Sequence, residues 1–566
     1  MNIRNIFLWG ILGVCGFGSA SALAALPEKL EQVPVQHSGR IKPFETFAGE
    51  ALLSVTGKSR WDGQNASEIV WQWIASPEKW ASRPLLVVPS KDLRREFSLM
   101  VIGGRMSPEV ALQNKAFLDK AQAAAMRRSR KEKLGVEERA VLEVYDKAAA
   151  FRRIAEGAEP GWIAHPQEPR AGWLSMQEFM APEAAGALAQ FYDSGSVARV
   201  RESSAEVLTA LRENPETLES RAADFVRALE QLFESGGVIL DQDLLRAERI
   251  YNRLSPFGWA WKSYLAAMLF CFGISIFFKS QSGILKKIVL GAAMFFYAAG
   301  FLVHSYGFYL RCLISGRPPV TNMYESIIWV SWAVVFFAAI LWAFYRAAMI
   351  PATASLVAVF ALGIAHGFPV VLDPALSPLV PVLRSNLWLT VHVLTITLSY
   401  GAFALAWGLG HVVIFRFAGA PEKIERNKML AGFLYRALQI GVILLASGTV
   451  LGGVWANYSW GRFWGWDPKE TWALIALLGY LAVLHGRFAG WLGLFGFAAA
   501  SVAAFLGVVM AWNGVNFVLA AGLHSYGFGG GGALYVLGAA LFDLALVAGT
   551  AVYYKKRTSG IEAASV

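Results

Sequence analysis

The sequence is poor in charged residues and in cysteine. Only 16% of its 566 residues are charged and 55% are hydrophobic, whereas an ordinary soluble protein has about 25% charged residues. This composition excludes a cytosolic globular enzyme.

Cys15, Cys271 and Cys312 all lie in apolar segments, so they form neither a disulfide framework nor a metal-binding pair. Cys-x-x-Cys-His is also absent, so the chain is not itself a c-type cytochrome.

Acidic residues are scarce in the second half of the chain. Residues 27–257 contain 31 basic residues (Lys and Arg) and 33 acidic residues (Asp and Glu). Residues 258–554 contain 16 basic and 7 acidic residues. The net charge of +10 therefore comes mainly from the apolar half. Because membrane loops that face the cytoplasm are rich in Lys and Arg, this basic balance does not indicate a nucleic-acid partner.

The chain divides into three zones. Residues 1–25 resemble a secretory signal peptide or signal anchor, with Arg4 before an apolar stretch and small residues at 22–24; cleavage and retention both remain open. Residues 27–257 have the composition of a soluble domain that follows this segment out of the cytoplasm. Apolar residues at helical spacing predict that the domain is mostly helical: Val207, Leu208, Leu211, Leu218, Phe225, Leu229, Leu232 and Phe233.

Residues 258–556 consist of apolar segments of membrane-spanning length. Nine spans are expected, at about 258–279, 287–312, 326–346, 352–370, 387–416, 431–456, 470–487, 490–511 and 532–554. The expected fold is therefore an all-α polytopic membrane protein with a mostly helical extracytoplasmic domain. Placing that domain outside puts about twice as many basic loop residues inside as outside, as the insertion rule requires. A bacterial plasma membrane with the domain on the periplasmic side is the expected location.

The predicted outer loop at residues 455–472 is unusually aromatic. Its aromatic residues are Trp455, Tyr458, Trp460, Phe463, Trp464, Trp466 and Trp472. An interfacial aromatic belt is one interpretation, but a belt is spread over many helix ends and does not need Asp467 and its polar neighbours. Glycine spacers suit a close approach to a flat object. We therefore expect a shelf for a planar apolar ligand, with Arg462 and Lys469 available for its carboxylates.

Two of the eight histidines fall on the same side as this loop. His392 is expected one to two turns from the outer end of its helix, and His524 in the outer loop 512–531. Two neutral imidazoles that flank an aromatic shelf suit bis-His ligation of heme iron. His485 lies near the inner surface, whereas His304 lies in the outer half of its helix.

Several segments together resemble one family. Residues 460–472 resemble the tryptophan-rich WWD signature of heme-handling membrane proteins, and the supporting segments are residues 387–403, 484–487, 523–526 and 317–325. Within that superfamily the chain resembles CcsA (ResC-like), the heme-handling part of the System II cytochrome c synthase. The resemblance covers about residues 258–554. Residues 38–47 also resemble the soluble region that precedes this module in fused bacterial forms.

This resemblance implies a set of roles. It implies that His392 and His524 are the axial ligands of heme b at the outer site, and that His485 is one ligand of a heme within the membrane. The second membrane ligand comes from the CcsB (ResB-like) portion in fused synthases, so a CcsB partner is expected here. His304 is a less favoured substitute, because the predicted topology places it nearer the outer face than His485.

The resemblance also implies the reaction. Heme crosses or enters the membrane, is held at the outer site, and is joined by thioether bonds to the Cys-x-x-Cys-His of apocytochrome c. No residue resembles a dedicated acid or base, so positioning is expected to dominate, with Trp460, Trp464, Trp466 and Asp467 as the template. The other expected heme contacts are Trp455, Phe463, Trp472, Arg462 and Lys469. Thiol-reducing proteins are conceivable further partners.

Two other functions are compatible with parts of this pattern. A heme exporter or chaperone that delivers heme to a separate lyase would share the aromatic loop. A b-type electron-transfer cytochrome typically has paired histidines, but His411 is the companion of His392 on its helix, 19 residues away or about 28 Å along a helix. That separation is too long for one heme, and such a cytochrome would leave the aromatic loop unexplained.

Overall fold

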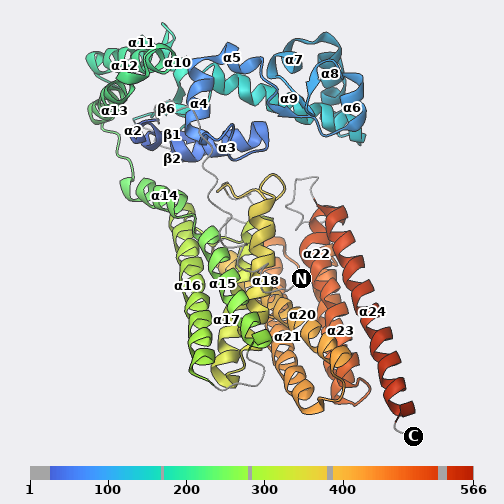
Figure 1. The fold of residues 1–566 in the computed structure, drawn as a ribbon. Helices are drawn as coiled ribbons and strands as arrows, with labels where there is room; N and C mark the ends of the chain where they lie inside the picture. The colour runs from blue at the N-terminus through green and yellow to red at the C-terminus, as the bar shows by residue number, and fades with distance from the viewer. Residues whose placement is uncertain (1–25, 167–170, 278–282, 379–385, 520–531, 565–566) are drawn as a thin grey trace, which may run out of the picture. The chain divides into compact units, whose positions relative to one another are not determined.

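The computed structural model describes residues 26–166, 171–277, 283–378, 386–519 and 532–564. These residues form two compact units that divide after Leu245 (Figure 1). We call them the soluble unit and the membrane unit. The predicted signal or anchor segment 1–25 and the predicted ligand His524 lie outside the described residues.

The soluble unit is mostly helical, as predicted, and contains two small sheets. The sheets have the strand orders β2-β1-β6-β7 and β3-β5-β4. The strands are β1 (Pro34–His37), β2 (Arg40–Pro43), β3 (Leu86–Val87), β4 (Val101–Ile102), β5 (Arg105–Met106), β6 (Gly161–Ile163) and β7 (Leu174–Ser175). The helices are α2 (Glu28–Gln32), α3 (Phe44–Thr56), α4 (Ala66–Ala75), α5 (Pro77–Ala81), α6 (Lys91–Glu96), α7 (Pro108–Gln113), α8 (Lys115–Ser129), α9 (Val136–Ala155), α10 (Met176–Met180), α11 (Ala184–Leu188), α12 (Ser194–Glu213), η2 (Pro215–Thr217) and α13 (Leu218–Ser235).

An aromatic core holds the soluble unit together. Phe44, Trp71 and Trp162 are buried and contact one another with ring centroids 4.9–5.5 Å apart. They come from α3, α4 and β6, so the core joins β6 to two helices that are distant from it in sequence. The start of α4 is stabilised by a capping box, in which Asn65 and Glu68 each accept the backbone N–H of the other.

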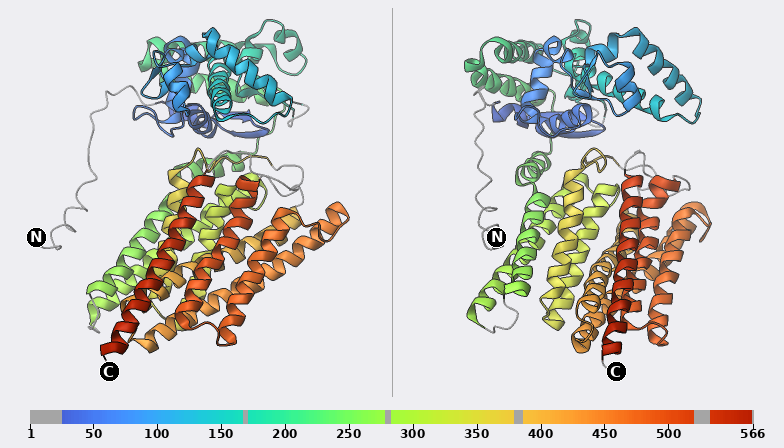
Figure 2. Two further views of the ribbon diagram at one scale, coloured as in Figure 1. Left: turned by 90° about the vertical axis from the view of Figure 1, so that its right-hand side faces the viewer. Right: turned by 45° about the vertical axis from the view of Figure 1, so that its right-hand side comes forward.

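The membrane unit contains long apolar helices that run roughly parallel or antiparallel to one another (Figure 2). Nine helical segments in the described part of the chain are long and apolar enough to cross a membrane, which confirms the predicted number. The helices are α14 (Gln242–Leu254), α15 (Pro256–Phe277), α16 (Ile284–Ser315), α17 (Met323–Tyr345), α18 (Met349–Gly367), α19 (Asn386–Trp388), η4 (Leu389–Val393), α20 (Leu394–Gly419), α21 (Ile424–Trp460), α22 (Pro468–Phe488), α23 (Leu494–Val509), η5 (Met510–Leu519) and α24 (Ala533–Ala564).

Several helices extend beyond their predicted apolar segments. α21 continues to Trp460, where Gly461 ends it in the left-handed conformation at φ 69°, a backbone state that glycine adopts without steric cost. The eighth span continues as the π-helix η5 to Leu519. An apolar run marks the part of a helix inside the membrane, whereas caps decide where the helix ends. The coil of the Trp-rich segment is therefore short and lies between Gly461 and Asp467.

Candidate functional site

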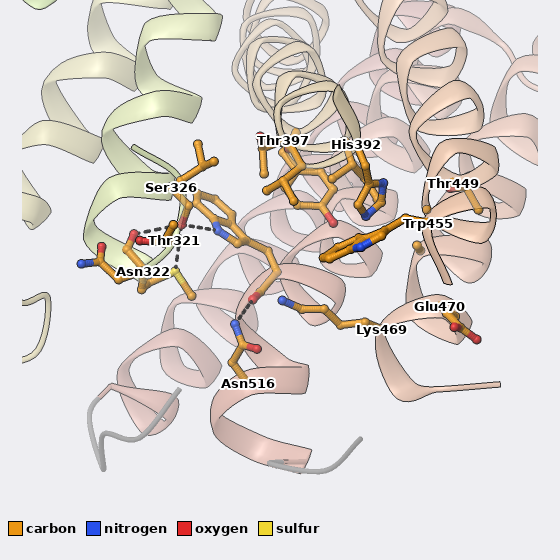
Figure 3. Close-up of a pocket in the computed structure, with 18 of the residues that line it drawn as sticks. Thr321, Asn322, Ser326, His392, Thr397, Thr449, Trp455, Lys469, Glu470 and Asn516 are labelled. Carbon is orange, nitrogen blue, oxygen red and sulfur yellow. Dashed lines mark hydrogen bonds between the residues drawn. The ribbon is translucent and has the colours of Figure 1, made fainter. Parts of the chain in front are cut away.

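A cavity of about 290 Å³ lies where several helices of the membrane unit meet. Its walls come from the start of α17, from η4 and α20, from the last turns of α21, from the start of α22 and from η5 (Figure 3). Both π-helices of the unit contribute to it. Wide π-turns inside helices are rare and occur frequently at functional sites.

His392 stands in this cavity on η4. Its Nδ1 donates a hydrogen bond of 2.8 Å to the backbone carbonyl of Gly448 on α21. That bond assigns the proton to Nδ1 and the lone pair to Nε2, which is the arrangement of a metal-ligating histidine. The ring also lies against Gly452, where a Cβ atom would come within 2.5 Å of the His392 Cε1 atom. A glycine at this position of α21 is therefore required by the imidazole.

Two tryptophans of the Trp-rich segment line the same cavity. Trp455 is buried, its ring centroid lies 5.6 Å from that of His392, and it stacks on Trp460 at 6.1 Å. Trp464 also lines the cavity and meets Trp466 edge-on at 5.9 Å. The segment therefore supplies a flat apolar surface beside the imidazole, as Figure 3 shows for Trp455 and His392.

The short coil 461–467 turns some of its side chains outward. Trp466 is 69% exposed and has a φ of 56°, a strained conformation for a bulky residue. Phe463 is half-exposed and its ring packs on Gly453 of α21. Arg462 lies over Gly465, where a Cβ would overlap the guanidinium. Arg462, Phe463 and Trp466 do not line the cavity, and neither do Trp460 and Trp472.

The start of α22 is organised by a capping box. The Asp467 side chain accepts the N–H of Lys469 at 3.0 Å, and Glu470 Oε2 accepts the N–H groups of Gly465 and Asp467 at 2.8 and 3.2 Å. Pro468 occupies the first helical position, where its missing N–H costs nothing. The buried Asp467 thus caps the helix; its predicted part in templating stays a prediction.

This cap directs Lys469 toward the cavity. Lys469 lines the cavity, and in Figure 3 it reaches from α22 toward the space near Trp455 and Asn516, whereas Glu470 points away. None of the salt bridges among the described residues involves the Lys469 ammonium group. A cation directed into a cavity is suited to bind the carboxylate of a ligand.

The wall opposite His392 is formed by the start of α17. Asn322 caps this helix through the backbone N–H of Glu325, and Thr321, Asn322 and Met323 line the cavity. On η5, the indole of Trp512 donates to Ser326 Oγ at 2.9 Å, which joins η5 to α17 across the cavity. These bonds connect the walls, so the shape of the cavity depends on all of them.

A buried ion network supports that wall from behind. Glu325 is fully buried and pairs with Arg311 at 2.8 Å and with Arg317 at 3.1 Å. Its second oxygen, Oε2, also accepts the N–H and hydroxyl of Thr321 at 2.8 Å each. Arg311 and Arg317 further donate to the backbone carbonyls of residues 374 and 377. The network therefore ties α16, the start of α17 and the 368–378 loop together.

The other predicted heme ligands lie elsewhere. His485 is exposed near the opposite end of α22, 16 residues or roughly 24 Å from Lys469 at 1.5 Å per residue, and its Nδ1 donates to Leu481 O at 2.7 Å. His304 is fully buried between Phe257 and Phe308, with Nδ1 3.3 Å from the hydroxyl of Tyr264. The cavity therefore brings together His392, Trp455, Trp464 and Lys469, but neither His485 nor His304.

Sequence reasoning missed several residues of this site. Ser326, Thr397, Thr449, Trp512 and Asn516 line the cavity but were not singled out. Two of them had a detectable signal, because a tryptophan and an asparagine four residues apart continue a helix face beyond the predicted end of the eighth span. Asn516 Nδ2 donates to Trp512 O at 3.1 Å, and its Oδ1 is buried without a hydrogen-bond partner among the described residues.

Comparison with known families gives a match that includes the whole cavity. The family described as cytochrome C assembly protein matches residues 320–524. The matched range begins at the α17 wall and contains His392, the Trp-rich segment, His485 and His524.

Two types of relative resemble different lengths of the chain. Cytochrome c biogenesis protein CcsA of Prochlorococcus marinus (strain AS9601) is 36% identical over 247 residues, which cover 38% of this chain and 79% of that protein. The CcsA protein of Synechococcus sp. (strain CC9311) is 35% identical over 255 residues, 39% of this chain and 82% of that protein.

The longer relative is protein NrfI of Wolinella succinogenes. It is 29% identical over 518 residues, which cover 87% of this chain and 53% of NrfI. Because 87% of the chain is more than the membrane unit contains, the similarity extends into the soluble unit. The chain spans about half the length of NrfI.

Proposed function

Because the chain belongs to the CcsA family of cytochrome c biogenesis proteins, we propose that it binds heme as a substrate at the cavity and promotes its covalent attachment to apocytochrome c. One observation carries this proposal: His392, two tryptophans and Lys469 converge on one cavity from η4, α21, α22 and the coil between α21 and α22. Their chemistry matches the iron, the flat apolar ring and the carboxylates of heme. The cavity end of the bundle is then the periplasmic side, where c-type cytochromes are assembled in this family.

The first proposed role is to hold the heme iron. His392 Nε2 carries the lone pair that iron needs, because Nδ1 is bonded to Gly448 O. His524, outside the described residues, is the proposed second ligand and follows η5, which forms one wall of the cavity. Two imidazoles keep other ligands from the iron and leave both ring edges accessible.

The second proposed role is to orient the ring. Trp455 and Trp464 contact its apolar face, and Lys469 pairs with a propionate. Fixing the carboxylate edge at Lys469 also fixes the vinyl edge, which lies on the other side of the porphyrin. The protein thereby presents the vinyl groups in one orientation to the incoming peptide.

The chemistry is an addition of thiols to vinyl groups. Each cysteine thiol of Cys-x-x-Cys-His adds across one vinyl double bond, so that sulfur bonds to one carbon and the thiol proton goes to the other. The addition needs no net oxidant or reductant. The peptide histidine replaces one of His392 and His524 on the iron, which places both thiols over the vinyl groups. Holding the reactants this way makes the step effectively unimolecular.

The proposed transit site at His485 requires a second polypeptide segment. His485 is exposed on α22, with its lone pair on Nε2 because Nδ1 donates to Leu481 O. A CcsB-type partner that contributes a second histidine would complete bis-His ligation of a heme within the membrane. NrfI extends far beyond its match to this chain, which supports a requirement for additional protein. The soluble unit is proposed to dock on that partner or on the apocytochrome.

The test is to coexpress the chain, a CcsB homologue and an apocytochrome in a host that lacks other maturation genes. Substituting His392→Ala should reduce covalent cytochrome c to the background of the assay, and added imidazole should partly restore it by filling the vacant axial position. His366→Ala, which changes an exposed histidine of α18 away from the cavity, is the matched control. Normal cytochrome from His392→Ala would refute the ligand role.

The same experiment separates synthesis from heme delivery. If the purified complex contains heme but makes no covalent cytochrome without an added lyase, the chain is a heme exporter or chaperone. If the chain alone carries heme at both sites and makes holocytochrome, the proposed CcsB partner is unnecessary. Absorption spectra of the purified complex and covalent heme on the product distinguish these outcomes.

A further inference from the structure

A second feature of the membrane unit lies between α20 and α24, outside the heme cavity. An open groove is lined on the α20 side by Phe415, Ala418 and Gly419, and on the α24 side by Ala545, Leu546, Gly549, Thr550 and Tyr553. The lining is mostly apolar; its polar groups are the phenol of Tyr553 and the hydroxyl of Thr550, which donates to Leu546 O within its own helix. The groove is therefore suited to an apolar ligand.

Polar contacts join the two helices on both sides of this groove. Toward the helix centres, Asp543 on α24 lies 2.8 Å from His411 Nε2 and accepts the Trp407 indole N–H at 3.1 Å. At the other end, Arg557 donates to the carbonyls of Ala418 and Gly419 at 3.1 and 2.8 Å. The two contacts hold α24 beside α20, and the small side chains between them leave the groove unfilled.

Apart from these polar contacts, Tyr554 of α24 stacks on Phe495 of α23 with ring centroids 4.5 Å apart. None of the described side chains of α24 is fully buried, although this helix crosses the membrane. Figure 1 shows α24 at the edge of the helix bundle. A groove at such a position opens toward the acyl chains of the bilayer, so a lipid chain has direct access to it.

Basic residues continue the groove face beyond Tyr553. Lys556 follows Tyr553 by three residues, so it lies on the same face of α24, and it is exposed next to Lys555. Cations at the end of a membrane helix lie at the level of lipid phosphates and attract anionic lipids. The groove therefore combines an apolar channel with a cation where the headgroup of a lipid would be.

We propose that this groove binds one acyl chain of an anionic phospholipid whose phosphate pairs with Lys556. Heme is the less suitable occupant, because the groove lining supplies no histidine and the nearest one, His411, is engaged by Asp543. The lipid would fill the space between the polar contacts and hold α24 against α20.

The experiment uses the purified full chain in a mild detergent. Native mass spectrometry counts retained lipid, and thermal unfolding is measured with added phosphatidylglycerol or phosphatidylcholine. The groove variant is Gly549→Leu, because a Cβ at Gly549 meets no atom within 4 Å and the larger side chain would extend into open space. Gly538→Leu is the matched control, on nearly the same face of α24 and equally open, but outside the groove.

Wild-type protein and Gly538→Leu should each retain one phosphatidylglycerol and gain the same increase in Tm from it. Gly549→Leu should lose both the retained phosphatidylglycerol and the increase in Tm that this lipid gives. Lys556→Gln should still bind a lipid but lose about fivefold in its preference for phosphatidylglycerol, as expected from removing one basic residue near a phosphate. If Gly549→Leu fails to fold, Ala545→Leu fills the same groove from a neighbouring turn.

Three results would overturn the proposal. One is an unchanged lipid count and Tm increase in a folded groove variant. Another is loss of the same lipid from Gly538→Leu, which would place the lipid elsewhere on α24. The third is release of a porphyrin rather than a phospholipid when the groove is filled.

Discussion

Charged side chains are numerous and largely exposed in the soluble unit, whereas in the membrane unit they are few and several are buried. Arg128 and Asp146 of the soluble unit pair at 3.1 Å with more than half of each side chain exposed. Arg311 and Glu325 of the membrane unit pair at 2.8 Å with both side chains fully buried. Pairs of similar length therefore lie in very different surroundings.

The difference shows where charge determines structure. An exposed pair contributes little, since water solvates both partners well when they separate. A buried pair contributes strongly to specificity, because the loss of one partner leaves an uncompensated charge in an apolar interior. In the membrane unit, Glu325 joins α16 to the start of α17 and thereby positions one wall of the cavity. The scarcity of acidic residues in this half makes each remaining one a candidate for such a role.

The largest effect is expected at Glu325. Glu325→Ala leaves Arg311 and Arg317 buried without their carboxylate, and should lower the free energy of unfolding by about 3–5 kcal/mol. Thermal unfolding of the purified chain in detergent measures this loss. Glu422→Ala, which removes an exposed carboxylate from the same unit, is the control. Equal Tm values for the two variants would remove the distinction between buried and exposed charges.

A smaller effect is expected at the pair that joins α20 to α24. His411→Leu leaves Asp543 in an apolar environment with Trp407 as its remaining neutral donor, and should cost about 2 kcal/mol. The double variant with Asp543→Leu should recover most of this stability, because no carboxylate is then left in apolar surroundings without His411. A double-mutant cycle by thermal unfolding measures the coupling. Strictly additive losses would show that the pair does not act as a unit.

The soluble unit contains one buried cation that permits a pH test. Lys42 is 2% exposed and donates to Glu50 at 2.5 Å. Burial alone would raise the pKa of Glu50, but a hydrogen bond with His37 and the charge and hydrogen bond of Lys42 outweigh it, so this pKa lies below its ordinary value of 4.5. The ionised carboxylate thus stabilises the folded state above pH 4.5, and that contribution is lost as the pH falls through the lowered pKa.

Glu50→Gln should therefore destabilise the soluble unit at neutral pH, by about 1–2 kcal/mol. The difference from wild type should shrink as the pH falls below 4.5. Pulse proteolysis of the full chain, followed at cleavage sites within the soluble unit, measures this stability. A difference that is independent of pH would show that the ionisation of Glu50 is not responsible.

The smallest effect is expected at the exposed Arg128–Asp146 pair. Asp146→Asn should change the free energy of unfolding by no more than about 0.5 kcal/mol, and added salt should remove even that difference. The same pulse proteolysis assay applies. A loss as large as that of Glu50→Gln would contradict the view that exposure determines the value of these pairs.

The sequence predicted the class of fold well, because membrane spans depend on local composition. A helix in lipid satisfies all of its backbone hydrogen bonds within one segment, so the nine spans could be counted without knowing how they pack. Helix ends were less predictable. α21 extends past its apolar run to Trp460, because termination depends on caps such as Gly461.

The site was predictable only in part, because the meeting of its residues depends on how the helices pack. The Trp-rich segment and His392 stood out as residue types that carry chemistry, and the structure brings His392, Trp455, Trp464 and Lys469 to one cavity. It turns Trp466 outward instead, a direction that depends on one backbone dihedral angle. Asp543 lay unnoticed in the last apolar run, although an acid at that depth is a signal in itself.

By itself, then, the sequence determined the membrane helices, their number and the residue types available to the proposed site. The tertiary structure alone decided which of these residues meet. Hydrophobic burial is non-directional, so it specifies that a helix lies in the membrane without specifying its neighbours or its rotation. Directional contacts make that choice: the bond from His392 to Gly448, the Glu325 network and the Asp467 cap hold the walls of the cavity in one arrangement.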